Sequence, residues 1–181
     1  MEVEALLKSF LDLSNETLTA ATVVIAASLL LYNLTRNLRD RVARTSSIVL
    51  ACVTITYICD AFVSLQPSPG VFEAVLRIQW IGIALMPAGM FHLSDALLAT
   101  TGLPSRGRRR RVSRTLYAIG ATFIVAAAFT DILIQPTHNG PDVGMRAGSL
   151  FPVYLLYFVL AVGTALINVQ RARQRCLTRD T

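Results

Sequence analysis

Ionisable side chains stand inside the most apolar stretches of this chain, and they are the residues that could do chemistry there. One apolar stretch begins with Arg77 and ends with His92 and Asp95, and an earlier one contains Asp60. A charged group that leaves water loses favourable hydration unless a partner replaces the water. Each of these residues is therefore a candidate for ligand recognition or proton transfer, and its role depends on the elements that hold it.

The composition indicates that those elements cross a membrane. Of the 181 residues, 54% are hydrophobic and 15% are charged, which is more apolar than an ordinary soluble domain. The apolar residues form five blocks, each long enough to cross a hydrocarbon core of about 30 Å as a helix. We therefore predict an all-α integral membrane protein, a bundle of five transmembrane helices near residues 18–34, 47–65, 72–98, 116–134 and 150–169.

The arginines predict the orientation of this bundle. Fourteen of the 17 basic residues follow the first, third or fifth block. Short loops rich in Lys and Arg stay in the cytoplasm, so we expect the N-terminus outside and the C-terminus in the cytoplasm. The fourteen are Arg36, Arg39, Arg41, Arg44, Arg106, Arg108, Arg109, Arg110, Arg111, Arg114, Arg171, Arg173, Arg175 and Arg179.

Two segments flank the predicted bundle, which occupies residues 18–170. Residues 1–17 are the expected extracytoplasmic N-terminal segment; they lack the basic start of a cleaved signal peptide and could form a short helix on the membrane surface. Residues 171–181 are the expected arginine-rich cytoplasmic tail.

The run RGRRRR in the third inter-block loop has two interpretations. Clustered arginines bind phosphate, which suggests nucleic acid. A basic cytoplasmic loop between two spans needs no nucleic acid to explain it, and we favour that interpretation. Contact with anionic lipid headgroups at the cytoplasmic face follows from the same charge.

A first group of polar residues is expected near the outer surface. Asp60, Glu73, Arg77 and Asp131 fall at similar depths once the spans alternate in direction. Glu73 and Arg77 have the i, i+4 spacing that places an ion pair on one helical face. Asp60 and Arg77 lie on either side of the short turn QPSPG, so we expect them to face each other.

Two aromatic residues complete this outer group. Tyr57 lies one turn from Asp60, and Trp80 one turn from Arg77. Together they outline a polar depression that would bind an extracytoplasmic ligand or sense the envelope. The alternative is structural: Arg77 reaches the interface, Trp80 joins the aromatic belt, and Asp60 only neutralises Arg77.

A second group lies in the inner half of the third span. The i, i+3 spacing of His92 and Asp95 puts them on one helical face. A histidine beside a carboxylate could act as a proton-responsive switch, or the two could be a structural pair that binds a neighbouring helix. A metal site is not expected, because the other histidine, His138, falls in an outside loop.

Pro87 stands in the middle of the same span. A proline inside a membrane helix removes one backbone hydrogen bond and usually bends the helix. Small residues surround it and would let another helix approach closely. We therefore expect the third span to be the central one and a candidate moving element; the small residues are Gly82, Ala84, Ala88 and Gly89.

Several functions are excluded by what the sequence lacks. The single lysine, Lys8, lies outside the spans, so a retinal Schiff base in the bundle is excluded. The sequence has no phosphate-binding loop, no dinucleotide-binding glycine pattern and no serine nucleophile motif. We expect no catalytic domain in this chain and no cofactor.

A short pattern in the third block carries a family likeness. The string GIALMP is followed by Phe91 and by Gly102 at the exit. This stretch resembles the third helix of the seven-transmembrane sensor region at the N-terminus of many bacterial histidine kinases and some diguanylate cyclases. The expected outside N-terminus and basic inner loops agree with that family. The pattern is formed by Gly82, Ile83, Ala84, Leu85 and Pro87.

The sequence departs from that family in two respects. The family has two further spans before its signalling domains, whereas we expect this chain to stop after the fifth. His92 and Asp95 replace positions that are mostly apolar in the family, so a role for them would be particular to this chain. The resemblance implies an input module that passes an envelope or membrane signal to a cytoplasmic kinase or cyclase, and it implies no ligand.

The expected function is therefore a membrane-embedded sensory input module of a bacterial signal-transduction protein, of the histidine kinase or diguanylate cyclase type, in the inner membrane and either truncated or acting through a partner. The partners implied are the bilayer and a cytoplasmic signalling domain, with a homodimer left open. The first alternative is a small transporter or permease subunit in which His92 and Asp95 relay protons. A passive scaffold that holds a partner by its arginine-rich face is the second.

Overall fold

A computed structural model describes residues 2–36, 40–65, 68–102, 107–139 and 142–177. Within these ranges five helices each contain a stretch long and apolar enough to cross a membrane, as predicted. A two-stranded hairpin, which was not predicted, lies between the last two helices. The elements are α1 (Glu2–Arg36), α2 (Arg41–Ser64), α3 (Pro69–Thr100), α4 (Gly107–Phe129), β1 (Ile134–Asn139), β2 (Asp142–Ala147) and α5 (Phe151–Leu177).

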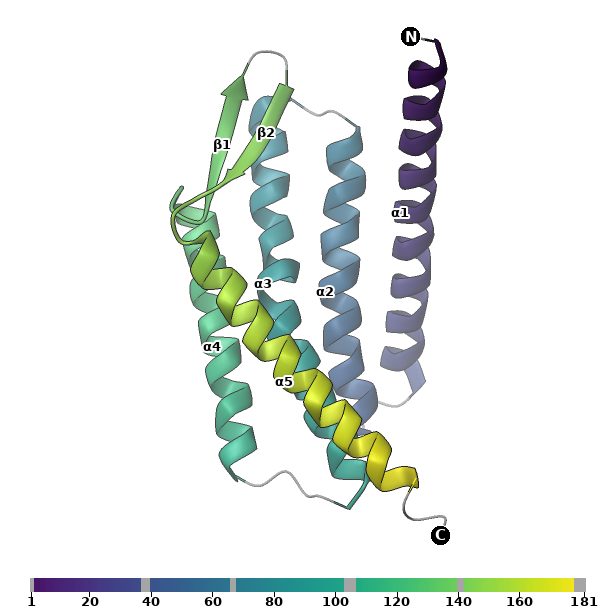
Figure 1. Cartoon of the computed structure of the whole chain (residues 1–181), viewed down its shortest axis with the longest axis vertical. Coiled ribbons are helices and arrows are strands. Elements are labelled where there is room, and N and C mark those ends of the chain that lie inside the picture. The colour runs from purple at the N-terminus through teal and green to yellow at the C-terminus, as the bar shows by residue number, and fades with distance from the viewer. Residues whose placement is uncertain (1, 37–39, 66–67, 103–106, 140–141, 178–181) are drawn as a thin grey trace.

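The helices are arranged around α3 (Figure 1). α2, α4 and α5 all pack against α3, and α1 packs against α2 at the edge of the bundle. α5 crosses α3 obliquely, and the two chain termini lie at opposite ends. We call the end with the strands the hairpin end, and the end where α2 and α4 begin the arginine-rich end.

The central position predicted for the third span is confirmed. In α3, 56% of the apolar window is buried, against 11% to 28% in the other four spans. Small side chains allow this close packing: Ala84 and Ala88 are fully buried, and a Cβ on Gly82 would collide with the Thr56 hydroxyl and the Cys52 carbonyl of α2. Helices without bulky side chains at their contact approach closely and gain dispersion energy.

The fourth helix differs from the prediction at both ends. It begins at Gly107 and ends at Phe129, whereas the apolar pattern predicted residues 116–134. The apolar residues Leu133, in the bend before the hairpin, and Ile134, the first residue of β1, are buried against the bundle. The strands are antiparallel, with Ile134 opposite Ala147. The apolar pattern therefore continued past the helix because the hairpin also contributes to the core.

The first helix is longer than predicted. α1 continues from Glu2 to Arg36 without a break at residue 17, so the N-terminal segment is not a separate surface helix. Neither Pro nor Gly interrupts these 35 residues, which span about 50 Å at the α-helical rise, more than a bilayer core requires. The apolar side chains of Leu6, Leu7 and Phe10 near its start are exposed.

Candidate functional site

Arg77 connects α3 to the end of α4 at the hairpin end. Its Nη2 lies 2.8 Å from Glu73 Oε1 and 2.7 Å from Asp131 Oδ1. Its Nη1 donates to the carbonyl of Ala127 at 2.6 Å. The last carbonyls of a helix have no partner within the helix, so the guanidinium of Arg77 caps α4. The predicted Glu73–Arg77 pair is confirmed, and Asp131 joins it.

The predicted pair of Asp60 with Arg77 is wrong. Arg77 faces α4, while the residue that reaches α2 is Gln79, whose side-chain amide donates to the carbonyl of Thr56 at 3.2 Å. Residues 77 and 79 differ by about 200° around a helix, so only one of them can face α2. The sequence offered two faces of the third span and no means of choosing between them.

The two aromatic residues of the outer group are separated as well. Trp80 is buried, with its ring centroid 5.0 Å from that of Tyr154 and 6.4 Å from that of Phe151, and so belongs to the interface with α5. Tyr57 and Asp60 are half-buried on α2. Their role in ligand recognition stays a prediction, without Trp80 and Arg77 as neighbours.

Pro87 lies fully buried inside α3, and α5 compensates for the hydrogen bond that it removes. A proline has no N–H, so the carbonyl four residues earlier, that of Ile83, has no helical donor. The Tyr154 hydroxyl of α5 donates to this carbonyl at 3.0 Å. We call this contact the α3–α5 joint.

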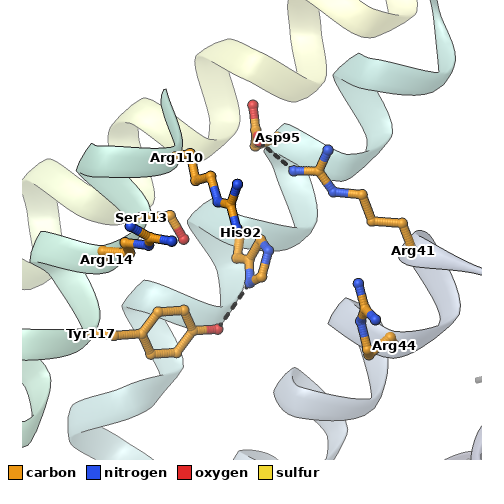
Figure 2. Close-up of a pocket in the computed structure, with 8 residues that line it drawn as sticks. All are labelled: Arg41, Arg44, His92, Asp95, Arg110, Ser113, Arg114 and Tyr117. Carbon is orange, nitrogen blue, oxygen red and sulfur yellow. Dashed lines mark hydrogen bonds and ion pairs between the residues drawn. The ribbon is translucent and has the colours of Figure 1, made fainter. Parts of the chain in front are cut away.

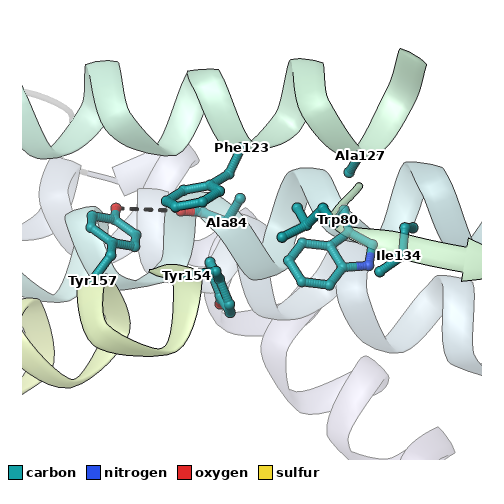
Figure 3. Close-up of a cluster of buried hydrophobic side chains, with 8 residues drawn as sticks. Trp80, Ala84, Phe123, Ala127, Ile134, Tyr154 and Tyr157 are labelled. Atoms are coloured by element: carbon teal, nitrogen blue, oxygen red, sulfur yellow. Dashed lines mark hydrogen bonds between the residues drawn. The ribbon is translucent and has the colours of Figure 1, made fainter. Parts of the chain in front are cut away.

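A second tyrosine ties the same region to α4. The Tyr157 hydroxyl lies 3.2 Å from the carbonyl of Leu116 in α4 and 3.4 Å from that of Ala84 in α3. Figure 3 shows Tyr154 and Tyr157 beside Phe123, which forms an edge contact with Tyr154 at 5.4 Å. The joint is therefore enclosed by aromatic rings from α4 and α5. A movement of α5 would change its contacts with both α3 and α4.

A cavity of about 500 Å³ lies between α2, α3 and α4 at the arginine-rich end (Figure 2). His92 and Asp95 both line it, which confirms that they share one face of α3. His92 Nδ1 lies 3.3 Å from the Tyr117 hydroxyl of α4. The complete lining is Arg41, Arg44, His92, Asp95, Arg110, Ser113, Arg114 and Tyr117.

Asp95 binds arginines, not His92. Its Oδ2 accepts from Arg41 Nη2 at 2.9 Å and its Oδ1 from Arg109 Nη1 at 3.4 Å, while its side chain is 1% exposed. In the described part of the chain His92 and Asp95 bond neighbouring helices rather than each other, as the structural alternative expected, and their role as a proton-responsive switch stays a prediction. Arginine side chains are long, so those at the starts of α2 and α4 reach the carboxylate across the helix ends. Asp95 holds these two starts together through α3.

The chain matches a known protein family over most of its length. The family model described as the N-terminal 7TM region of histidine kinase matches residues 18–179. The chain belongs to this family. A search of the curated proteins and a search of the solved structures found no match. The likeness expected from the third span is thus confirmed over most of the chain.

Membership of the histidine kinase 7TM family places the chain among multi-pass membrane proteins. Regions of this family are non-catalytic sensory inputs. The matched residues include both partners of the α3–α5 joint, Ile83 and Tyr154, together with Pro87 and all residues that line the cavity.

Proposed function

We propose that this chain is the membrane-embedded sensory input module of a histidine kinase. The match to the family model over residues 18–179 is the observation that carries this proposal. Most arginines of the described helices lie at the arginine-rich end. Their position supports an orientation with that end in the cytoplasm of a bacterium. In that orientation α5, like α1 and α3, runs toward the cytoplasmic side, and its last turns carry Arg171, Arg173 and Arg175 there.

The proposed mechanism is a shift of α5 against α3 at the joint. A two-state element needs a contact with two packing arrangements of similar free energy. At Pro87 the helical ladder of α3 lacks one bond, and the donor that replaces it comes from Tyr154 of another helix. Movement of α5 would break the bond from Tyr154 to this carbonyl. An α3 without a proline would satisfy the carbonyl itself and offer α5 no such contact.

The input side of the module is proposed at the hairpin end. Arg77 fixes the end of α4, from which the chain enters β1, and Trp80 one turn along α3 contacts Tyr154. A force or ligand at the hairpin would therefore reach the joint through one turn of α3. Tyr57 and Asp60 on α2 remain proposed ligand contacts beside it.

The test is phosphorylation of the native polypeptide. The chromosomal gene is tagged near Met1, and the tagged polypeptide is isolated from its own membranes together with bound partners and incubated with radiolabelled ATP. The proposal expects acid-labile phosphate, the mark of phosphohistidine, on the tagged polypeptide or on a partner that co-purifies with it. Absence of such phosphate from both would reject the kinase input and leave the transporter as the stronger interpretation.

A further inference from the structure

The cavity at the arginine-rich end holds more positive charge than its carboxylate neutralises. Its lining contains four arginines and one aspartate. Asp95 is already bound by Arg41 and by Arg109. Among the described residues, no carboxylate forms an ion pair with Arg44, Arg110 or Arg114. Three guanidinium groups thus border one cavity with no acidic partner in the described part of the chain.

These three arginines come from opposite sides of the cavity. Arg44 belongs to α2, and Arg110 and Arg114 lie one turn apart on α4. Figure 2 shows the α2 and α4 side chains on either side of His92, with Tyr117 and Ser113 on the α4 side. The arrangement offers guanidinium and hydroxyl donors from two helices toward the same space.

The chemistry of these donors matches a phosphate group. Guanidinium groups form charge-assisted hydrogen bonds, often in pairs, with the oxygens of phosphates. A volume of about 500 Å³ exceeds what a single inorganic anion needs and lies within the range of small-molecule sites. We propose that the cavity binds a phosphate-bearing anion, either the headgroup of an anionic phospholipid or a soluble phosphate compound.

The position of the cavity fits both sources. It begins beside Arg41, the first residue of α2, and extends to Tyr117, about 10 Å along α4 from Arg110. Such a depth corresponds to the headgroup region and the edge of the hydrocarbon core. The proposal concerns binding alone, so it holds whether or not the chain regulates a kinase.

The alternative is that the arginines attract anions only as a general basic surface. α4 offers a matched control, because Arg108 and Arg111 lie in the same turns, are exposed, and do not line the cavity. The double variants Arg110→Gln/Arg114→Gln and Arg108→Gln/Arg111→Gln remove the same charge from the same helix. Only the first changes the cavity.

Binding is measured on the purified full chain in an uncharged detergent. Native mass spectrometry counts bound dioleoyl phosphatidylglycerol against dioleoyl phosphatidylcholine, and calorimetry follows inorganic phosphate and glycerol 3-phosphate. We expect one tight site in the parent chain, weakened about tenfold or more by Arg110→Gln/Arg114→Gln, since each lost charge-assisted bond suffices for such a change. The Arg108→Gln/Arg111→Gln pair should stay within about threefold.

Arg44→Gln supplies an independent test from the other wall of the cavity. It should weaken the binding of the same ligand. Thermal unfolding of each variant checks that the bundle is intact. Selective loss of phosphatidylglycerol identifies a lipid site, and selective loss of the soluble phosphates identifies a soluble ligand. Equal loss in both double variants, or no saturable binding of any probe to the parent chain, overturns the proposal.

Discussion

The Tyr154 hydroxyl of α5 donates to the carbonyl of Ile83 in α3, the acceptor that Pro87 leaves without a helical donor. A buried carbonyl that loses its only donor costs about 1–3 kcal/mol. At this position α5 is therefore held to α3 by a bond that α3 cannot make for itself. This dependence makes the joint the natural place for α5 to respond to α3.

The joint predicts a coupling between Tyr154 and Pro87. Tyr154→Phe keeps the ring but removes the donor, and should lower the free energy of unfolding in detergent by about 1–3 kcal/mol. In a Pro87→Ala background the backbone N–H at position 87 can serve Ile83, so Tyr154→Phe should cost less there. A double-mutant cycle of unfolding free energies measures the coupling. Equal costs in both backgrounds would mean that the two residues act separately.

Close packing of α2 on α3 gives a second prediction. Gly82→Ala places a methyl group against the Thr56 hydroxyl and the Cys52 carbonyl, and a backbone carbonyl cannot move aside easily. We expect a loss of about 1–3 kcal/mol in unfolding free energy. Gly163→Ala in α5 is the control, because no atom lies within 4 Å of its Cβ, and it should stabilise the helix by about 0.5–1 kcal/mol. A neutral Gly82→Ala would refute the close contact.

Asp95 predicts a loss of stability that is specific to the arginine-rich end. Asp95→Asn removes the charge that Arg41 and Arg109 share, and leaves both guanidinium groups with a weaker acceptor. The expected loss is about 1–3 kcal/mol of unfolding free energy, because two partly exposed guanidinium groups lose the buried carboxylate that bonds both of them. Glu16→Gln on the exposed side of α1 removes the same charge and should be neutral. If both variants unfold alike, the Asp95 bridge adds nothing to stability.

The orientation can be tested with a native thiol. Cys176 is exposed near the end of α5, whereas Cys52 and Cys59 are buried. A membrane-impermeant maleimide should leave Cys176 unlabelled in intact spheroplasts and label it after permeabilisation, if the arginine-rich end is cytoplasmic. Ser149→Cys at the exposed hairpin end should react in intact spheroplasts. The opposite pattern would invert the bundle.

Local spacing predicted what lies within one helix. The i, i+4 order of Glu73 and Arg77 correctly indicated their ion pair, and the shared face of His92 and Asp95 was also correct. The long apolar runs located α3 to within a few residues. Such features follow from the helical period alone.

Contacts between helices could not be read from spacing. Asp95 binds Arg41, 54 residues earlier, and Tyr154 binds Ile83, 71 residues earlier. Pro87 predicted a carbonyl without a helical donor, and a buried tyrosine hydroxyl can supply one. Nothing in the local sequence identified Tyr154 as that donor among the five tyrosines. Leu133 and Ile134 were wrongly assigned to the fourth helix, because buried strands and buried helices are equally apolar over a few residues.

A change at the joint should appear directly in kinase output. The tagged native polypeptide is assayed in its own membranes for acid-labile phosphate, with the parent chain, Tyr154→Phe and Gly163→Ala compared at equal protein amount. We expect Tyr154→Phe to change the rate of phosphorylation several-fold and Gly163→Ala to leave it unchanged. A parent chain that is phosphorylated at the same rate as Tyr154→Phe would contradict the claim that α5 signals through its contact with α3.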